Sequence, residues 1–303
     1  MPKLGVEICG VKFKNPVIAA SGTFGFGREF DALYDISVLG GISVKGLTLQ
    51  KRLGNPPPRI AETKSGILNS VGLQNPGVDA FINEDLPWLK QKDLVVIANI
   101  AGSTVEDYVK MAEKLAPTAV DMLEMNISCP NVKEGGVAFG VKPEKIFEVT
   151  KAVCGAARQP VIVKLSPNAA DIAENARAAE EAGAQALSLI NTLTGMVVDV
   201  YRKRPVLFNN FGGMSGAAVR PIALRMVYQA AHAVKIPVIG MGGITSGEDA
   251  AAFMLCGARA VMVGTQNFSD PMAMPKIVSE LHRYLEKTGV VDVNDIVDAL
   301  VMN

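Results

Sequence analysis

The stretch Val120-Asp-Met-Leu-Glu-Met-Asn-Ile-Ser-Cys-Pro-Asn-Val-Lys-Glu-Gly-Gly136 joins a short apolar run to a polar loop. Residues Val120–Met125 are typical of a buried strand, and that character stops at Asn126. The loop that follows holds a proline and paired glycines, which mark a change of chain direction. In α/β proteins, polar loops at the carboxyl ends of buried strands commonly carry the chemistry. This stretch therefore predicts a buried strand with a functional loop attached to it.

Cys129, near the start of this loop, is the candidate catalytic residue. Pro130 fixes its own φ and biases Cys129 towards extended geometry, so that the thiol is held in place. Gly135-Gly136 allow the backbone to turn sharply or to lie close to a partner. The alternative is a small apolar cysteine in a turn. The position at a strand end favours the functional interpretation.

The same order of strand, polar loop and helix recurs along the chain. The expected strands are Val17–Ala20, Gly41–Lys45, Val95–Asn99, Met122–Asn126, Val161–Lys164, Ala186–Ile190, Val238–Met241 and Ala260–Val263. The expected helices start after Ser103 or Thr104 and near Pro143, and cover Ala170–Ala182, Pro221–Val234, Glu248–Leu255, Pro271–Thr288 and Val293–Val301. This alternation predicts an α/β fold, a closed parallel TIM (β/α)8 barrel, with residues 1–303 as a single domain. An open doubly wound sheet is the competitor, but the first strand lacks a dinucleotide-binding glycine fingerprint.

Three segments fall outside this alternation. Gly5–Phe13 alternates apolar and polar residues around Cys9-Gly10, which predicts a small N-terminal hairpin. Gly46–Pro76 and Asn191–Arg220 are long, rich in turn-forming residues and poor in periodicity. We expect both to be long loops on the face formed by the carboxyl ends of the strands, and Gly46–Pro76 to act as a lid or a binding loop.

The composition excludes several classes of protein. Lys+Arg and Asp+Glu balance at 30 each, and no basic tract occurs, which argues against a nucleic-acid partner. No apolar stretch reaches about 18 residues and the N-terminus lacks a signal-peptide core, so we expect a cytoplasmic protein without a membrane anchor. The 4 cysteines are widely spaced and only 2 histidines are present, so no metal or cluster site is expected in this chain.

Each expected strand ends in a polar or very small residue. These residues are Ser21, Lys45, Asn99, Asn126, Lys164, Asn191, Gly242-Gly243 and Gly264-Thr265. Strands must leave into polar loops in any case, so each residue alone has an ordinary explanation. In a parallel barrel, however, they all converge on one face. Two lysines and three asparagines in one mouth predict an anionic, amide-rich ligand.

Glycine-rich segments follow the last two expected strands, at residues 240–245 and 263–266. In barrels, the loops at this position often bind phosphate through backbone N–H groups. Relief of crowding is the alternative, and the pairing of two such segments favours phosphate. A phosphate site beside amide-binding groups, without a nicotinamide fingerprint, suggests flavin mononucleotide (FMN). Lys164 can then neutralise charge that builds on the reduced ring.

Four segments, taken together in this order, resemble the dihydroorotate dehydrogenase family from about Val6 to Gln266. They are Asn69–Asn75, Asn126–Gly136 with Phe139-Gly140, Val163–Pro167 and Gly240–Ile244. Cysteine rather than serine in the loop is similar to the soluble class 1 enzymes. The Lys-Glu-Gly-Gly continuation and the lack of a membrane-binding N-terminal extension resemble the NAD-linked subclass 1B.

The resemblance implies oxidation of (S)-dihydroorotate to orotate in de novo pyrimidine (UMP) biosynthesis. In subclass 1B this chain is the catalytic subunit and carries FMN. A partner electron-transfer subunit holds FAD and a [2Fe-2S] cluster and passes the electrons to NAD+. The implied assembly is a heterotetramer built on a homodimer of this chain.

The resemblance also implies a role for each matched residue. Cys129 is the general base that takes the proton from C5 while hydride leaves C6 for the flavin; an unassisted thiol, with a pKa of about 8.5, is a poor base at neutral pH. The implied flavin contacts are Ser21, Lys45, Gly46, Asn99, Asn126, Lys164, Ile190, Gly216, Gly242, Gly243, Gly264 and Thr265. The implied substrate contacts are Lys45, Asn69, Ser70, Val71, Gly72, Leu73, Asn126, Asn191 and Thr192. Gly46–Gln74 is expected to roof the substrate, and movement of the Cys129 loop to admit it; residues 204–215 have no assignment beyond loop.

Two rival interpretations remain open. The fumarate-linked class 1A enzymes are homodimers that need no second subunit. Outside flavoenzymes, an aldolase-type barrel could use Lys164 as a Schiff-base amine, and a non-catalytic barrel could simply hold a phosphate ligand. Bound flavin, which is yellow, distinguishes the flavoenzymes from an aldolase-type or non-catalytic barrel.

Overall fold

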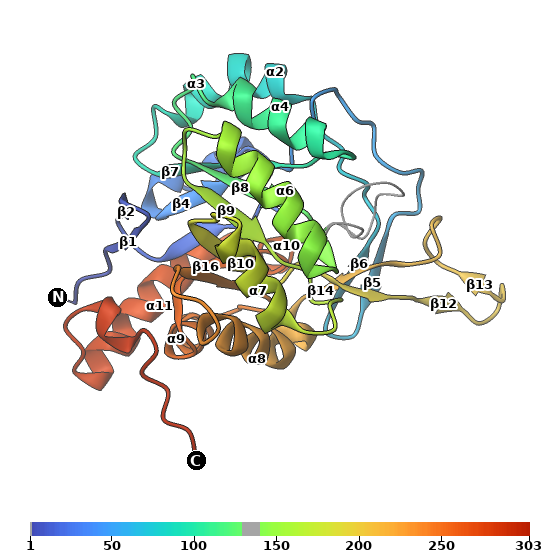
Figure 1. Ribbon diagram of the computed structural model, residues 1–303. Coiled ribbons are helices and arrows are strands. Elements are labelled where there is room, and N and C mark those ends of the chain that lie inside the picture. Colours follow the sequence, from blue (N-terminus) through green and yellow to red (C-terminus); the bar gives the residue numbers. More distant parts are fainter. Residues whose placement is uncertain (1, 129–139) are drawn as a thin grey trace.

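Eight parallel strands close into a barrel at the centre of the molecule (Figure 1). A computed structural model describes residues 2–128 and 140–303. Each strand pairs with its neighbour in the chain order of the barrel, and the last pairs with the first. The strands are β3 (Val17–Ala19), β4 (Gly41–Ser43), β7 (Val95–Ile100), β8 (Met122–Asn126), β9 (Val161–Lys164), β10 (Ala186–Leu189), β15 (Val238–Met241) and β16 (Ala258–Val263). The predicted α/β barrel is confirmed.

Amphipathic helices cover the outside of the barrel. They include α4 (Val105–Leu115), α6 (Pro143–Ala156), α7 (Ile172–Glu181), α8 (Arg220–Ala231), α9 (Gly247–Leu255) and α11 (Ala273–Thr288). On α4, the buried face carries Tyr108, Met111, Ala112 and Leu115, spaced three to four residues apart as a helix on a core requires. Thr104 caps α4 in a reciprocal pair with Asp107, which decides between the two predicted caps.

Shorter helical segments complete the shell. They are α1 (Arg28–Asp31), η1 (Ile36–Val38), α2 (Val78–Ala80), the π-helical turn η2 (Phe81–Asp85), α3 (Leu86–Leu89), η3 (Ala217–Val219) and α10 (Gln266–Ser269). Within the described ranges, no helix has the length and apolar character needed to cross a membrane.

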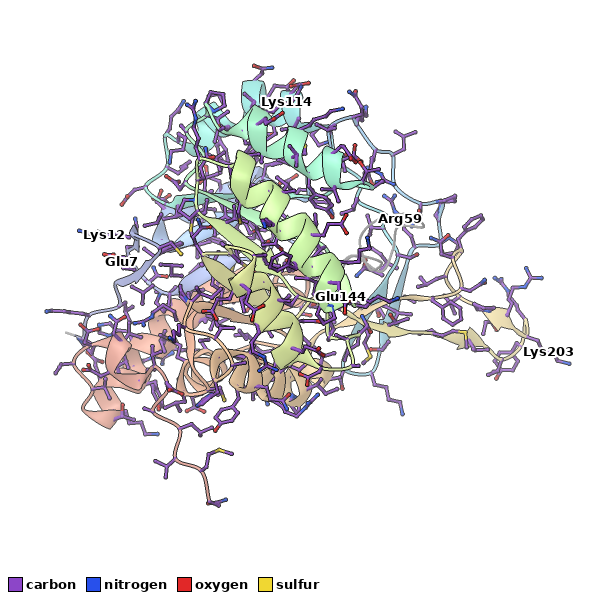
Figure 2. All side chains as sticks on the ribbon, viewed as in Figure 1. Glu7, Lys12, Arg59, Lys114, Glu144 and Lys203 are labelled. Atoms are coloured by element: carbon purple, nitrogen blue, oxygen red, sulfur yellow. The ribbon has the colours of Figure 1, made fainter. Side chains whose placement is uncertain are left out.

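A hairpin of β1 (Val6–Ile8) and β2 (Val11–Phe13) lies at one end of the barrel, as predicted (Figure 1). Buried Ile8 and Phe13 join the main hydrophobic core. Figure 2 shows Glu7 and Lys12 of this hairpin on the opposite side of the molecule from Lys203. The hairpin therefore closes the end that lies away from the carboxyl ends of the barrel strands.

The two long segments predicted as loops, Gly46–Pro76 and Asn191–Arg220, contain short strands that the sequence analysis did not predict. An antiparallel sheet, here called the roof sheet, pairs strands from both segments in the order β11-β14-β6-β5. Its strands are β5 (Ile60–Thr63), β6 (Gly66–Asn69), β11 (Leu193–Gly195) and β14 (Gly212–Ser215), and a further pair, β12 (Val198–Asp199) with β13 (Arg204–Pro205), forms a protruding arm (Figure 1). These strands are two to four residues long, and three of the four roof strands contain glycine, so they show no local periodicity. They form because residues far apart in sequence pair with one another.

The prediction of a C-terminal helix at Val293–Val301 was wrong. Only the 3-10 turn η4 (Val293–Ile296) forms there. Asp298 adopts φ 61°, which interrupts a right-handed helix. The backbone N–H groups of Asp298 and Leu300 then donate to the carbonyls of Met254 and Leu255 rather than to a helical partner.

Candidate active site

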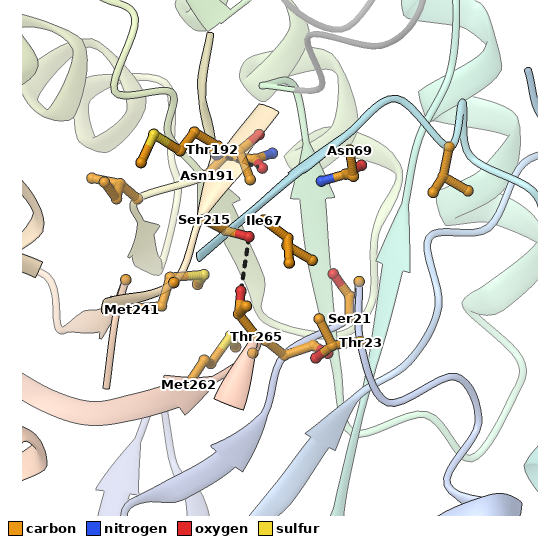
Figure 3. A pocket seen from close by; sticks show the side chains of 18 of the residues that line it. Ser21, Thr23, Ile67, Asn69, Asn191, Thr192, Ser215, Met241, Met262 and Thr265 are labelled. Atoms are coloured by element: carbon orange, nitrogen blue, oxygen red, sulfur yellow. Dashed lines mark hydrogen bonds between the residues drawn. The ribbon is translucent and has the colours of Figure 1, made fainter. Parts of the chain in front are cut away.

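A cavity opens at the carboxyl ends of the barrel strands, and the roof sheet covers it (Figure 3). The empty space within it amounts to about 1140 Å³, open solvent included. Residues at or just after the carboxyl ends of β3, β4, β8, β9, β10, β15 and β16 line it, and β5, β6 and β14 of the roof sheet supply further residues. The roof sheet comes from the two long segments Gly46–Pro76 and Asn191–Arg220, here called the crossover segments. The barrel and the crossover segments therefore build the site together.

The cavity brings together most of the residues that the sequence analysis named as flavin or substrate contacts. Lys45 and Lys164 line one cavity, although they follow different strands. Of the nominated flavin contacts, those that line it are Ser21, Lys45, Asn126, Lys164, Ile190, Gly216, Gly242, Gly243, Gly264 and Thr265. Of the nominated substrate contacts, those that line it are Lys45, Asn69, Val71, Gly72, Leu73, Asn126, Asn191 and Thr192.

Three nominated residues that the structure describes stand apart from this lining, and a fourth lies outside the described residues. Asn99 is fully buried beneath the cavity. Gly46 packs on it, since a Cβ on Gly46 would lie 2.9 Å from Asn99 Oδ1. Ser70 is fully buried, and within the described residues its hydroxyl has no hydrogen-bond partner. Cys129 lies outside the described residues, as does most of the loop that follows it.

A carboxylate lies at the base of the cavity, inside the barrel. Glu124 is fully buried, and its Oε2 accepts hydrogen bonds from Ser43 Oγ at 2.7 Å and Asn99 Nδ2 at 2.5 Å. Its Oε1 accepts from Ser188 Oγ at 2.7 Å. Lys164 Nζ lies 3.9 Å from Oε2, and its side chain is only 7% exposed. Lys164, one of the two lysines that line the cavity, thus forms an ion pair with a carboxylate buried inside the barrel.

A row of asparagines leads from this carboxylate to the cavity. Asn99 Oδ1 accepts a hydrogen bond from Asn126 Nδ2 at 3.4 Å. Asn126 Oδ1 in turn accepts from Asn191 Nδ2 and from Ser128 Oγ, both at 3.3 Å. Asn191 Nδ2 also donates to Ser128 Oγ at 2.7 Å. The amides are fixed by one another before any ligand arrives.

Glycines at the other end of the cavity leave backbone exposed to a ligand. Gly242 and Gly243 have φ 131° and 76°, a region that other residues rarely adopt. A Cβ on Gly243 would lie 2.8 Å from Gly216 O. Asp249 holds the loop after β15, because its Oδ2 accepts from Thr245 N at 2.9 Å and Thr245 Oγ1 at 2.7 Å. This backbone at Gly216, Gly242 and Gly243, here called the glycine wall, fits the phosphate of FMN. The ammonium and amide groups fit the polar edge of its ring.

Close backbone contact fixes the roof sheet to this wall. A Cβ on Gly66 would lie 2.0 Å from Ser215 O, and one on Gly216 would lie 2.5 Å from the Gly66 Cα. Ser215 Oγ also accepts a hydrogen bond from Thr265 Oγ1 at 2.8 Å, across the cavity wall (Figure 3). The roof sheet and the loop after β16 are therefore joined directly.

Several lining residues escaped the sequence analysis. They include Thr23, Ile67, Met214, Ser215, Met241, Met262 and Phe268. Thr23 lies in a glycine-rich segment after the first barrel strand, for which a phosphate cradle and a plain turn were equally open interpretations. Ile67 and Ser215 are register partners in the roof sheet, so only that pairing could have nominated them. Met241 sits between Gly240 and Gly242, and this position was the one available signal for it.

The remaining described cysteines are not candidates for the chemistry. Cys9, Cys154 and Cys256 are free thiols, and none of them lines the cavity. Burial raises the pKa of each, that of Cys154 to about 11, so they are protonated at neutral pH. Among the residues that the structure describes, no group of His, Cys, Asp and Glu could hold a metal ion.

The closed barrel has the glycine wall at one side of its mouth and lysine and amide groups at the other. These features define an enzyme of the (β/α)8 class that binds a phosphate-bearing cofactor. The family model described as "Dihydroorotate dehydrogenase" matches residues 3–285. The chain belongs to the dihydroorotate dehydrogenase family, whose members depend on FMN.

Similar curated proteins extend over almost the whole chain. The chain is 54% identical to the "Dihydroorotate dehydrogenase B (NAD(+)), catalytic subunit" of Alkaliphilus oremlandii, over 98% of each chain. It is 54% identical to proteins of the same description from Thermoanaerobacter pseudethanolicus, over 98% of each chain, and from Geobacter metallireducens, over 99% of this chain and 98% of the relative.

Proposed function

We propose that this chain is the catalytic subunit of an NAD+-linked dihydroorotate dehydrogenase and oxidises dihydroorotate to orotate in pyrimidine biosynthesis. The observation that carries the proposal is the cavity in which Lys45, Lys164, Asn126 and Asn191 meet opposite a glycine wall. The names of the relatives support the NAD+-linked class. We further infer that residues 1–303 act as one FMN-binding domain and that the enzyme works in the cytoplasm.

FMN supplies the hydride acceptor when it is bound. The glycine wall and Thr265 would hold its phosphate, since backbone N–H groups and a hydroxyl suit that anion. Lys164 and the amide of Asn126 would hold the polar edge of the ring, where Lys164 favours the negative charge that reduction brings. Asn99 and Gly46 would act from beneath, because neither lines the cavity.

Lys45 and the amide side chains would bind the substrate. Lys45 is suited to the carboxylate, and Asn69, Asn126 and Asn191 are suited to the amide edges of the pyrimidine ring. Ser70 would act indirectly, by holding the backbone of the segment that runs from Asn69 to Leu73. A site built from amides rejects analogues that leave them unpaired.

Cys129 would take the proton from C5 of dihydroorotate on its Sγ as the hydride leaves C6. The C5–H and C6–H bonds break, and the C5–C6 double bond of orotate forms. The roof sheet would limit access of water to this step, because it covers the cavity. A low-dielectric surrounding strengthens every charged contact of the site.

We also propose an electron-transfer subunit that carries FAD and a [2Fe-2S] cluster, in a heterotetramer with two copies of this chain. The words "catalytic subunit" in the names of the relatives support a partner of this kind. The fumarate-linked class 1A homodimer is the alternative, and an aldolase or non-catalytic barrel is excluded by membership of an FMN-dependent family.

Purification with and without the partner subunit tests the proposal. We expect the isolated chain to carry FMN and to be reduced by dihydroorotate, but to reduce NAD+ only in the complex. Efficient reduction of fumarate by the isolated chain, or of NAD+ without the partner, would contradict the NAD+-linked assignment. A purified chain that binds neither FMN nor orotate would contradict the proposed function itself.

A further inference from the structure

Glu124 is a fully buried acid for which the proposed reaction has no role. It lies on β8 two residues before Asn126, so the two side chains point to the same side of the strand. Its three hydrogen-bond donors come from three other strands: Ser43 from β4, Asn99 from β7 and Ser188 from β10. Four strands of the barrel thus converge on one carboxylate.

The surroundings of Glu124 suit a negative charge. Burial of an unpaired carboxylate is costly, and a hydrophobic residue would pack the barrel without that cost. Here two hydroxyls and an amide donate to its two oxygens at 2.5 to 2.7 Å, which are the short distances of charge-assisted bonds. The Lys164 ammonium at 3.9 Å completes the set. The arrangement stabilises a carboxylate directly beneath a cation of the cavity.

The carboxylate also decides which way the amides point. It can only accept hydrogen bonds, so the nitrogen of the Asn99 amide faces it and Oδ1 faces Asn126. Asn126 must then present Nδ2 to Asn99, which leaves its Oδ1 to accept from Asn191. A glutamine at position 124 could donate as well as accept, so it would no longer fix this order.

We propose that Glu124 is a positioning residue that sets both the orientation of the asparagine row and the net charge beneath the flavin. Its negative charge offsets part of the positive charge of Lys164, which lowers the tendency of bound FMN to accept electrons. Its fixed acceptor character holds Asn126 and Asn191 ready for the ring of the substrate. The inference rests on the proposed function, because it places FMN and orotate in this cavity.

Glu124→Gln tests the proposal, because it keeps the shape and removes the charge. We expect the variant to bind FMN and its equilibrium constant for two-electron reduction to rise at least tenfold, about 30 mV for such a couple. We also expect orotate, followed by the absorbance change of the flavin, to bind at least tenfold more weakly. The midpoint potential comes from a redox titration and needs no turnover.

Ser43→Ala and Ser188→Ala are matched controls. Each removes one hydrogen bond to Glu124 and leaves its charge, so the reduction equilibrium should stay within threefold of the wild type. Glu124→Asp retains the charge but is too short to hold Asn99. It should lose orotate affinity while the potential is kept, and it tests the proposal if Glu124→Gln does not fold.

A Glu124→Gln protein with wild-type potential and wild-type orotate affinity would overturn the inference. Equal shifts of potential in Glu124→Gln and Ser188→Ala would do so as well, since loss of packing alone would then explain them. A potential that shifts in Glu124→Asp as it does in Glu124→Gln would contradict the role of charge. The wild-type protein is titrated first, so that failure to hold FMN or orotate counts against the proposed function and not against Glu124.

Discussion

The floor strands β8 and β9 and the roof sheet face each other across the same cavity, but they are built differently. Every residue of β8 and β9 is buried, and both belong to the main hydrophobic core. The roof sheet is mostly half-exposed and packs around a separate small cluster of Ala61, Leu68 and Leu207. The floor therefore holds its charged groups inside a large core, whereas the roof brings its polar groups to the cavity from a sheet with only a small core of its own.

The largest effect is expected for the loop that leaves the floor strand β8. Cys129→Ala should retain FMN and lose roughly 10²- to 10⁴-fold in turnover, the usual contribution of a general base. Turnover with dihydroorotate and flavin content by absorbance check this. Cys154→Ala is the matched control, since its thiol donates to Gly183 O away from the cavity, and it should be fully active. Loss of flavin from Cys129→Ala would show a structural role.

A change to the floor should act on the cofactor. Lys164→Ala should weaken FMN binding about 10- to 150-fold, because a charge-assisted contact contributes about 1.5 to 3 kcal/mol. It also leaves the Glu124 carboxylate without its cation, so thermal stability should fall. FMN dissociation and melting temperature are the measurements. Full retention of flavin with normal turnover would contradict the assignment of Lys164.

A change to the roof sheet should act on the substrate alone. Asn69→Ala should raise KM for dihydroorotate roughly fivefold or more, as expected for a lost hydrogen bond in a site that excludes water. FMN affinity should not change. Glu62→Ala, on exposed β5, is the control and should leave KM unaltered. If Asn69→Ala released FMN, the division of labour between floor and roof would be wrong.

The smallest effect is expected outside both regions. Thr104→Ala removes the cap of α4 and should lower the free energy of unfolding by about 1 kcal/mol, with wild-type KM and flavin content. Ser103→Ala keeps the cap and should be neutral. Urea denaturation of both variants makes the comparison, and equal stability would contradict the role of the Thr104–Asp107 pair.

The same contrast explains what could be predicted from the sequence. The barrel strands are short apolar runs followed by polar residues, so local pattern alone placed them and their ends, including Lys45, Asn126 and Lys164. The roof sheet depends on pairing between residues near position 67 and residues near position 214, which local pattern does not contain. Glu124 is one of two acidic residues in the run Val120–Met125, and only the closure of the barrel gave it four polar neighbours.

The contact between Gly66 and Gly216 has a consequence for how the two crossover segments can evolve. Neither position can gain even a methyl group without parting the strands that meet there. A replacement at one glycine requires a rearrangement at the other. We therefore expect the two segments to change together in evolution, although they lie nearly half the chain apart in sequence. Exchange of one segment alone with a distant homologue should therefore give a protein whose cavity does not close.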